Sequence, residues 1–343
     1  MELERPDLDN VEPDVLAYIE ALEAALARLQ GDGGAATREP EPSEPPTPLN
    51  VLTLTRLGVG KRTPRHFYTR QRRGGMGVFD LEADEGDPPL LLGVADENEA
   101  FLLFSNFGRA FRLHTNSVVE TPVRARGQLL SLPLQAHERI VAVLPADQDK
   151  AVAMVSQRGW VRSVRASYLG KGLIQGMTFH DVKEGGYLTA VCWTPGDGDL
   201  FIATRSGLGI RFAEHHVSQR GCLGIRVAQG DEAVGITAVS EESGVFLAGH
   251  DGKGTIRLMN GFGANKAPGA GGKVAMKADK LLGATAVRDS DDIFIISQLG
   301  KLIRFQAGEI PAKSGVVQGV NCIALRNDEA VAFTVSASGE VGS

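Results

Sequence analysis

The sequence predicts an all-β protein whose chain forms a propeller-like ring of six blades. Six apolar runs rich in strand-forming residues recur from residue 49 onward. Each run is followed by a glycine, and consecutive glycines of this set are 45 to 51 residues apart. Each repeat then ends in a second apolar run. Six copies of a unit of this length, with several short strands in each, are typical of a ring of radially repeated blades and not of two separate domains.

These features define the repeats and the expected blade boundaries. The opening runs are residues 51–55, 100–104, 151–155, 200–204, 245–249 and 293–297. The repeat glycines, which favour tight turns, are Gly58, Gly108, Gly159, Gly207, Gly252 and Gly300. The closing runs are residues 90–95, 139–144, 187–193, 233–239, 281–287 and 330–335. The expected blades are residues 49–97, 98–148, 149–196, 197–243, 244–290 and 291–341, within a ring that covers residues 49–343.

Ahead of the ring, residues 1–30 are expected to form an acidic helical arm and residues 31–48 a disordered linker. Pro13 suits the first turn of a helix over residues 12–30, and Gly31 suits its end. The apolar stripe of this helix is too short to be stable alone in water, so we expect it to pack on the ring, on a second copy in a dimer, or on another protein. The stripe consists of Val15, Ile19, Leu22, Leu26 and Leu29.

Charge is distributed unevenly along the chain. The net charge is −6, but residues 1–50 carry −9, so the remaining residues carry +3. Residues 56–73 hold seven Lys and Arg and no acidic residue. An acidic arm joined to a basic body indicates that the body binds an anion.

Two glycine-rich basic heptads follow in the first repeat, G-V-G-K-R-T-P at 58–64 and Q-R-R-G-G-M-G at 71–77. The second heptad resembles the GyrA box of the C-terminal DNA-wrapping domain found in the A chain of DNA gyrase, and the six repeats are similar to the six-bladed β-pinwheel of that domain. The resemblance covers residues 49–340. It implies that the box helps tie the first blade to the last and contacts DNA through Gln71, Arg72, Arg73, Gly74, Gly75, Met76 and Gly77. Met76 departs from the family pattern, which usually has Lys or Arg there.

Basic residues about four positions after the repeat glycine predict a curved basic track around the rim of the ring. They are Arg62, Arg112, Arg162, Arg211, Arg257 and Arg304. Because neutralised phosphates release counterions, such a track is expected to bind double-stranded DNA without sequence preference. The other rim residues expected to contact DNA are Lys61, Arg65, Arg70, Arg124, Arg126, Arg165, Lys171, Arg220, Lys273 and Lys313. Further candidates in the fourth and fifth repeats are Arg226, Lys266 and Lys277.

The function that these patterns favour is DNA binding and wrapping, as a module or stand-alone accessory of a DNA gyrase-like type IIA topoisomerase. The alternative is a protein-binding propeller that docks onto gyrase, a topoisomerase or another partner. No catalytic residue is expected, because no Ser/His/Asp spacing, H-x-x-x-H motif or P-loop is present. Isolated cysteines and dispersed histidines predict no metal and no cofactor. Tyr68 is interpreted as a rim or interblade aromatic.

The location expected from the sequence is the bacterial cytoplasm, in association with the nucleoid. No basic start precedes an apolar segment, so a secretory signal is not expected, and no apolar run reaches the length of a membrane span. The chain is interpreted either as a fragment of a complete gyrase A chain or as a stand-alone pinwheel protein, and Met1 with its arm favours the second.

Overall fold

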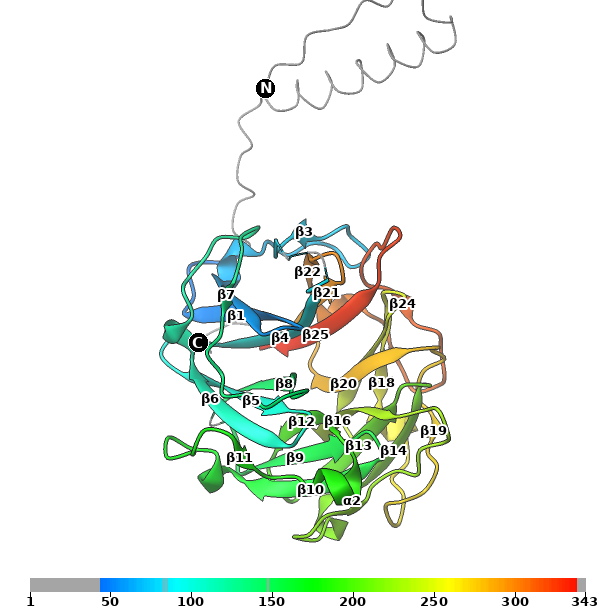
Figure 1. The fold of residues 1–343 in the computed structure, drawn as a ribbon. Helices are drawn as coiled ribbons and strands as arrows, with labels where there is room; N and C mark the ends of the chain where they lie inside the picture. The colour runs from blue at the N-terminus through cyan, green and yellow to red at the C-terminus, as the bar shows by residue number, and fades with distance from the viewer. Residues whose placement is uncertain (1–43, 83, 85, 147, 338–343) are drawn as a thin grey trace, which may run out of the picture. The chain divides into compact units, whose positions relative to one another are not determined.

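The described part of the chain is a ring of six β-sheets (Figure 1). The computed structural model describes residues 44–82, 84, 86–146 and 148–337. The predicted helical arm, and the predicted linker as far as residue 43, lie outside the described residues. Each sheet is one blade with antiparallel strands, apart from one short parallel pair in the fifth blade. The prediction of an all-β, six-bladed ring is confirmed.

Each blade has the same strand order from the axis of the ring outward, and its innermost strand is the closing run. The innermost strands are β4 (Pro89–Asp96), β8 (Ile140–Pro145), β12 (Leu188–Thr194), β16 (Ala233–Val239), β20 (Leu281–Val287) and β25 (Ala330–Ser336). Next come the opening runs, β1 (Leu49–Thr55), β5 (Ala100–Ser105), β9 (Ala151–Ser156), β13 (Asp199–Thr204), β17 (Gly244–Gly249) and β21 (Asp292–Ser297). The third strands follow the repeat glycine and are β2 (Val59–Pro64), β6 (Arg109–His114), β10 (Trp160–Arg165), β14 (Leu208–Ala213), β18 (Lys253–Leu258) and β22 (Lys301–Gln306).

The outermost strand of every blade comes from the repeat that follows it around the ring. The first blade receives β7 (Gln128–Leu129) from the second repeat, and β7 pairs with β2. The next four blades receive β11 (Met177–Thr178), β15 (Cys222–Leu223), β19 (Lys273–Val274) and, in the fifth, both β23 (Ala312–Lys313) and β24 (Val320–Asn321). The sixth blade receives β3 (Val78–Phe79) from the first repeat, which pairs with β22 and closes the ring. Strand exchange therefore links each blade to the next.

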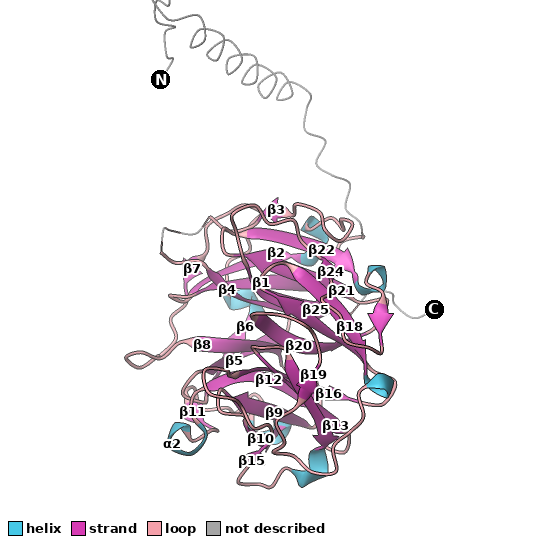
Figure 2. Ribbon diagram, turned by 90° about the vertical axis from the view of Figure 1, so that its right-hand side faces the viewer, coloured by secondary structure: helices cyan, strands magenta, loops and turns pink. Residues whose placement is uncertain are grey.

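Short helical turns join each third strand to the segment that carries the exchanged strand. Figure 2 shows the ring from its side. These 3-10 turns are η2 (Arg65–Phe67), η3 (Thr115–Ser117), η4 (Ala166–Tyr168), η5 (Glu214–His216), η6 (Met259–Gly261) and η7 (Ala307–Glu309). One α-helical turn, α2 (Val182–Gly185), precedes β12, and the Asp181 side chain caps it by accepting a hydrogen bond from the Lys183 backbone N–H. No helix in the described part of the chain is long and apolar enough to cross a membrane.

The hydrophobic core of the ring lies in the seams between successive blades. Side chains alternate along a strand, so Phe101 and Leu103 of β5 pack with the first blade, whereas Leu102 and Phe104 pack with the third. A strand with both faces buried needs a continuous apolar run, and five of the six opening runs show no polar alternation. The first run is the exception, and the hydroxyls of its Thr53 and Thr55 donate to Asp80 and Asp87. At the axis, the innermost strands surround a cavity of about 160 Å³.

The repeat glycines are expected to be essential to the strand geometry, and Gly159 offers the sharpest test. It has φ +79°, and a Cβ there would lie 2.1 Å from the Ile225 carbonyl oxygen in the strand-exchange segment. Replacing Gly159 with Ala should lower the free energy of unfolding by roughly 2 kcal/mol or more, because both the backbone and the contact become strained. Gly172→Ala is the control, since nothing lies within 4 Å of its Cβ position. Denaturant unfolding of the two variants measures the difference, and equal stability would contradict this account.

Candidate nucleic-acid interface

The box at residues 71–77 lies at the seam between the sixth and first blades, where it joins the two ends of the ring. The Gln71 N–H donates to the Arg304 carbonyl oxygen at 2.8 Å, and the Gly74 N–H donates to that of Cys322 at 2.8 Å. Gly77, at φ +69°, passes so close to β22 that a Cβ would lie 2.7 Å from the Leu302 carbonyl oxygen. The box thus leads the chain onto the sixth blade, where β3 begins. This geometry fits the blade-joining role that the resemblance implied.

The two arginines of the box have different environments. The Arg73 side chain donates from Nε to the Glu309 carbonyl oxygen at 2.9 Å, and its backbone N–H donates to the Glu309 carboxylate at 3.0 Å. Arg72 and Met76 are exposed, Met76 by 54%. Arg73 is therefore a seam residue, whereas Arg72 can meet a ligand at the surface.

A fully buried polar cluster lies beneath the box in the same seam. Lys61 Nζ lies 2.7 Å from Asp80 Oδ1, and the Tyr68 hydroxyl donates to the same oxygen at 2.5 Å. Burial lowers the pKa of Lys61 although the Asp80 carboxylate opposes this effect, and burial together with Asp80 raises the pKa of Tyr68. The Tyr68 ring meets Phe294 of the sixth blade edge to face at 6.1 Å. Of the two positions predicted for Tyr68, the rim and the space between blades, it occupies the second.

Four of the six arginines that follow a repeat glycine lie four residues after it, and these four point into the seam with the next blade. Each donates to a backbone carbonyl in, or directly after, the 3-10 turn of the next blade. Arg211 Nη1 donates to the Met259 carbonyl oxygen at 2.9 Å, and Arg304 Nη1 of the sixth blade donates to that of Tyr68 in the first at 3.0 Å. The other two contacts run from Arg62 Nε to Val118 at 2.7 Å and from Arg112 Nη1 to Leu169 at 3.3 Å. We call these four residues the latch arginines.

The third and fifth repeats depart from this pattern by one residue. Arg162 lies three residues after its glycine and Arg257 lies five after. Because side chains alternate along a strand, both point to the opposite face of their blade. The latch positions there hold Ser163, whose hydroxyl donates to Glu214 of the fourth blade at 3.2 Å, and Ile256, which packs in the core. The apparent recurrence of six equivalent arginines is therefore wrong at these two repeats.

Burial corrects the predicted track of DNA-contacting residues. Each of six predicted rim cations has at most 8% of its surface exposed, so it cannot present its charge to a polyanion in this fold: Lys61, Arg62, Arg65, Arg211, Arg257 and Arg304. Most of them are neutralised by acidic side chains, for example Arg211 by Asp199 at 2.7 Å. Arg70 is two-thirds buried and its guanidinium contacts both Asp292 carboxylate oxygens. Arg112 and Arg162 are half-buried.

The partner carboxylates were missed at the sequence level, although a signal was present. Asp199 and Asp292 each stand immediately before the apolar part of an opening run, in repeats that carry a latch arginine. Asn50 occupies the same place in the first repeat, and its Oδ1 accepts from Arg62 Nη1 at 2.9 Å. Pairing of this position with the arginine across the hairpin could have identified both as internal.

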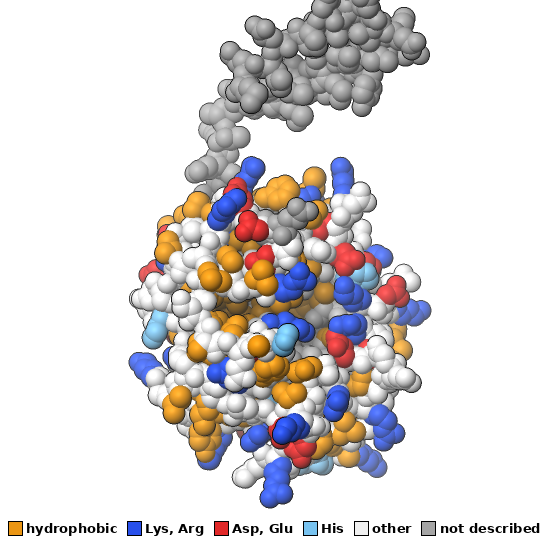
Figure 3. Space-filling model, in the orientation of Figure 1, with side chains coloured by type: hydrophobic (Ala, Val, Ile, Leu, Met, Phe, Trp, Pro, Cys, Tyr) orange, Lys and Arg blue, Asp and Glu red, His pale blue; other side chains and the backbone are white. Residues whose placement is uncertain are grey.

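The remaining predicted cations are exposed, and most lie on the segments that carry the exchanged outer strands. Figure 3 shows Lys and Arg side chains around the periphery of the ring and also on the visible face, beside the hollow at its centre. The exposed residues on these segments are Arg72, Arg124, Arg126, Lys171, Arg220, Arg226, Lys266, Lys273, Lys277 and Lys313. We call this set the rim cations. Arg165 is also exposed but lies at the end of β10, where it contacts the Tyr168 hydroxyl.

One group of exposed acidic side chains lies on a flat face of the ring, while Glu82, Glu120 and Asp279 are exposed on the segments that carry the rim cations. The loops that connect each innermost strand to the next opening run lie on one flat face of the ring. The exposed acidic residues on these loops are Glu97, Glu99, Asp149, Asp197, Glu241, Glu242 and Asp289. Lys150 and Arg288 are exposed on the same loops. The described ring is therefore basic on its outer edge and acidic on this face, although its net charge is small.

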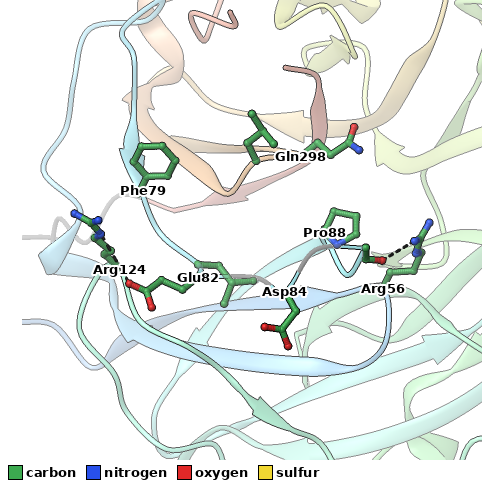
Figure 4. A pocket seen from close by; sticks show the side chains of 10 residues that line it. Arg56, Phe79, Glu82, Asp84, Pro88, Arg124 and Gln298 are labelled. Atoms are coloured by element: carbon green, nitrogen blue, oxygen red, sulfur yellow. Dashed lines mark hydrogen bonds and ion pairs between the residues drawn. The ribbon is translucent and has the colours of Figure 1, made fainter. Parts of the chain in front are cut away.

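A pocket of about 490 Å³ opens between the sixth and first blades, beside the box (Figure 4). Phe79 and Leu299 line it and are 52% and 59% exposed. Arg124 lies near Glu82 at one end, and Arg56 donates to the Gly86 carbonyl oxygen at the other. No group of three or more metal-ligating side chains occurs among the residues that the structure describes.

These features define a β-propeller ring closed by strand exchange, with a basic edge. Comparison with known proteins identifies its family. The model of the DNA gyrase C-terminal domain, a β-propeller, matches residues 49–87, 99–147, 198–240 and 291–338. The chain belongs to this family.

Among curated relatives, the DNA gyrase A chain of Ureaplasma parvum serovar 3 is 29% identical over 294 residues, which cover 82% of this chain and 35% of that protein. The DNA gyrase A chain of Escherichia coli K12 is 28% identical over 295 residues, with 82% and 34% coverage. The present chain thus spans about a third of the length of these relatives.

Two solved structures resemble the ring. The structure of a DNA gyrase A C-terminal domain matches with a TM-score of 0.74 and 20% identity, over 84% of this chain and 99% of that one. The crystal structure of the C-terminal domain of a DNA topoisomerase IV matches with a TM-score of 0.58 and 18% identity, over 84% and 94%. At these identities the two structures support the fold alone.

The latch arginines are expected to stabilise the ring. Arg211→Met should lower the free energy of unfolding by about 3–5 kcal/mol, because it leaves Asp199 without its buried partner and the Met259 carbonyl without a donor. Arg226→Met, on the exposed rim, should change it by less than about 0.5 kcal/mol. Chemical denaturation compares the two, and a stable Arg211 variant would contradict an internal role.

Substitution of the two box arginines should have different effects on the free energy of unfolding, measured in the same assay. Arg73→Ala removes contacts with Glu309 and should cost about 1–3 kcal/mol of stability. Arg72→Ala should leave stability unchanged within about 0.5 kcal/mol, because its side chain is exposed. Equal losses for both variants would show that the box is held in another way.

Proposed function

We propose that the ring binds duplex DNA on its outer edge without sequence preference and bends the DNA around itself. The observation that carries this proposal is the position of the rim cations, which recur on the exchanged segments from blade to blade. Duplex DNA is a dense polyanion, and each neutralised phosphate releases counterions. A basic edge that continues around a disc offers contacts along a curved path.

The energy of bending explains why many weak contacts are needed. Bending 20–30 base pairs by 40–90° costs of order 1–6 kcal/mol, and wrapping requires more. The rim cations are well separated around the ring, so the DNA must follow the edge to reach several of them. The acidic loops repel phosphates from one flat face and thereby favour the edge. Contacts of this kind read the backbone and the deformability of DNA, not its bases.

In this proposal the chain acts as a non-catalytic module or accessory of a gyrase-like type IIA topoisomerase in the bacterial cytoplasm, near the nucleoid. The family membership supports this setting, and the breakage chemistry would belong to another domain or another chain. A protein-docking role is the second candidate function. It rests on the pocket beside the box, where Phe79 and Leu299 expose apolar surface.

The first test removes charge from the rim. In the variant with Lys273→Gln and Lys313→Gln, DNA affinity at low salt should fall roughly tenfold, and the slope of log K against log salt should shrink by about 2. The matched control is Lys150→Gln with Arg288→Gln, which removes the same charge from the acidic face. Filter binding or fluorescence anisotropy with random duplexes gives both quantities. Equal effects of the two double variants would contradict an edge-bound path.

The second test adds charge at the box. Met76→Lys places a new cation on an exposed side chain next to the closure of the ring. We expect the slope of log K for DNA binding against log salt to steepen by about 0.9. The change in linking number when a nicked DNA circle is ligated in the presence of the protein should also increase. Met177→Lys, which also adds a charge to an exposed residue but on β11 in the second blade, shows whether the position matters. If wild type and Met76→Lys change circle topology equally, the box does not guide DNA.

A further inference from the structure

Glu44, just ahead of the first strand, inserts its carboxylate between two buried arginines of different blades. Its Oε1 accepts from Arg65 Nε at 3.0 Å and from Arg304 Nη1 at 3.1 Å. Its Oε2 accepts from Arg65 Nη2 at 2.8 Å and from Arg304 Nη2 at 2.8 Å. Arg65 belongs to the first blade and Arg304 to the sixth, so one carboxylate joins both sides of the closing seam.

Within the described residues, the charges around this point supply Arg65 with no counterion besides Glu44. Arg65 Nη1 donates only to neutral acceptors, the Ser336 hydroxyl at 2.8 Å and the Ala337 carbonyl at 2.7 Å. Asp292 contacts Arg304 and is shared with Arg70. Without Glu44, Arg65 would have no acidic partner among the described residues, and the buried Arg304 would share Asp292 with Arg70. A buried guanidinium without an acidic partner requires an anion.

The segment that carries Glu44 is attached to the ring by few other contacts. Residues 44–48 read E-P-P-T-P, and the three prolines have no backbone N–H to donate. The Thr47 N–H donates to His66 Nδ1 at 3.3 Å, and the Pro48 carbonyl accepts from the Glu97 N–H at 2.9 Å. Most of the attachment of Glu44 itself thus comes from its four charged hydrogen bonds, which an external anion of similar shape could replace.

We propose that the Arg65–Arg304 pair is an oxyanion-binding site that Glu44 fills from within the chain, and that a phosphate group binds there when Glu44 is displaced. Two guanidinium forks that face one carboxylate also match the oxygens of a phosphate. The site lies inside the seam and not among the rim cations. The proposal goes beyond DNA wrapping and does not rest on it.

The test replaces the internal ligand and supplies an external one. In Glu44→Ala the thermal midpoint should fall by about 5–10 °C, because the buried arginines lose their counterion. Inorganic phosphate should then raise this midpoint in proportion to the logarithm of its concentration, as expected for a ligand that binds only the folded state. Chloride at equal ionic strength should not reproduce the effect. Wild type should respond to phosphate no more than to chloride.

Two further variants keep the test decisive. Glu329→Ala is the matched control, since it removes an exposed carboxylate that pairs with Lys280. Glu44→Gln keeps the size of the side chain without its charge and serves if the alanine variant does not fold. If phosphate stabilises a Glu44 variant no more than wild type or Glu329→Ala, the proposal is overturned. A specific response to phosphate in the Glu44 variant alone supports it.

The source of the phosphate is resolved by a second arm of the experiment. If a DNA backbone phosphate reaches the site, Glu44→Ala should bind a short duplex several-fold more tightly than wild type, and saturating duplex should abolish the response to inorganic phosphate. If duplex affinity is unchanged and the response persists, the ligand is a free oxyanion. If no variant binds DNA, the proposed function is contradicted. The proposed oxyanion site is then decided by the shift of the thermal midpoint with inorganic phosphate alone.

The pH dependence of stability gives an independent check on Glu44 as the internal ligand. Burial raises the pKa of Glu44, but the hydrogen bonds and charges of Arg304 and Arg65 outweigh it, so its pKa lies below the ordinary value. Its stabilisation is therefore complete above the unfolded pKa of about 4.3 and is lost as the pH falls through the lower folded value. The stability difference between wild type and Glu44→Gln should be constant near neutral pH and should vanish in acid. A difference that persists in acid would contradict the ionic contact.

Discussion

The pairing of β3 with β22 closes the ring, and every other blade depends on that closure. Each blade takes its outer strand from the repeat that follows, so no blade is complete by itself. Only the first repeat can supply the strand that the sixth blade lacks. The box at residues 71–77 makes this possible, because its glycines allow the chain to pass within contact distance of β22. A unique signature heptad in one repeat of six therefore has a structural cause as well as any role toward a ligand.

The closing seam is also where the described ring concentrates its buried charge. Lys61 with Asp80, and Arg65, Arg70 and Arg304 with Asp292 and Glu44, lie within this single interface. Apolar seams tolerate small shifts in packing, whereas buried ionic groups require defined partners at defined distances. The seam that joins the two ends of the described ring therefore requires its charged partners at well-defined positions. Such specificity helps the two sides find one register, because contacts such as Arg70–Asp292 join residues more than two hundred positions apart in the sequence.

Basic residues serve two purposes in this fold. The latch arginines bind backbone carbonyls across seams and hold neighbouring blades in register, while the rim cations face solvent on the exchanged segments. The small net charge of the body hides this division, because acidic side chains lie on one flat face, in the seams and also on the exchanged segments.

The spacing of the glycines and the apolar runs predicted the six-bladed ring from sequence alone. Tight turns need glycine and buried strands need apolar residues, so both features recur in the sequence in every blade. The box was equally visible because its glycine spacing is local. Which arginines are buried was decided only by tertiary structure. Arg65 and Arg124 both stand in polar, basic stretches, but Arg65 is buried against Glu44 in the closing seam, whereas Arg124 is exposed near Glu82. Arg162 and Arg257 are offset by one residue from the latch position, and in sequence this difference seemed too small to matter. Because side chains alternate along a strand, the offset places both arginines on the opposite face of their blade. Strand exchange lay beyond sequence reasoning because two-residue strands such as β7 and β11 carry no pattern of their own and acquire their partners only when the ring closes.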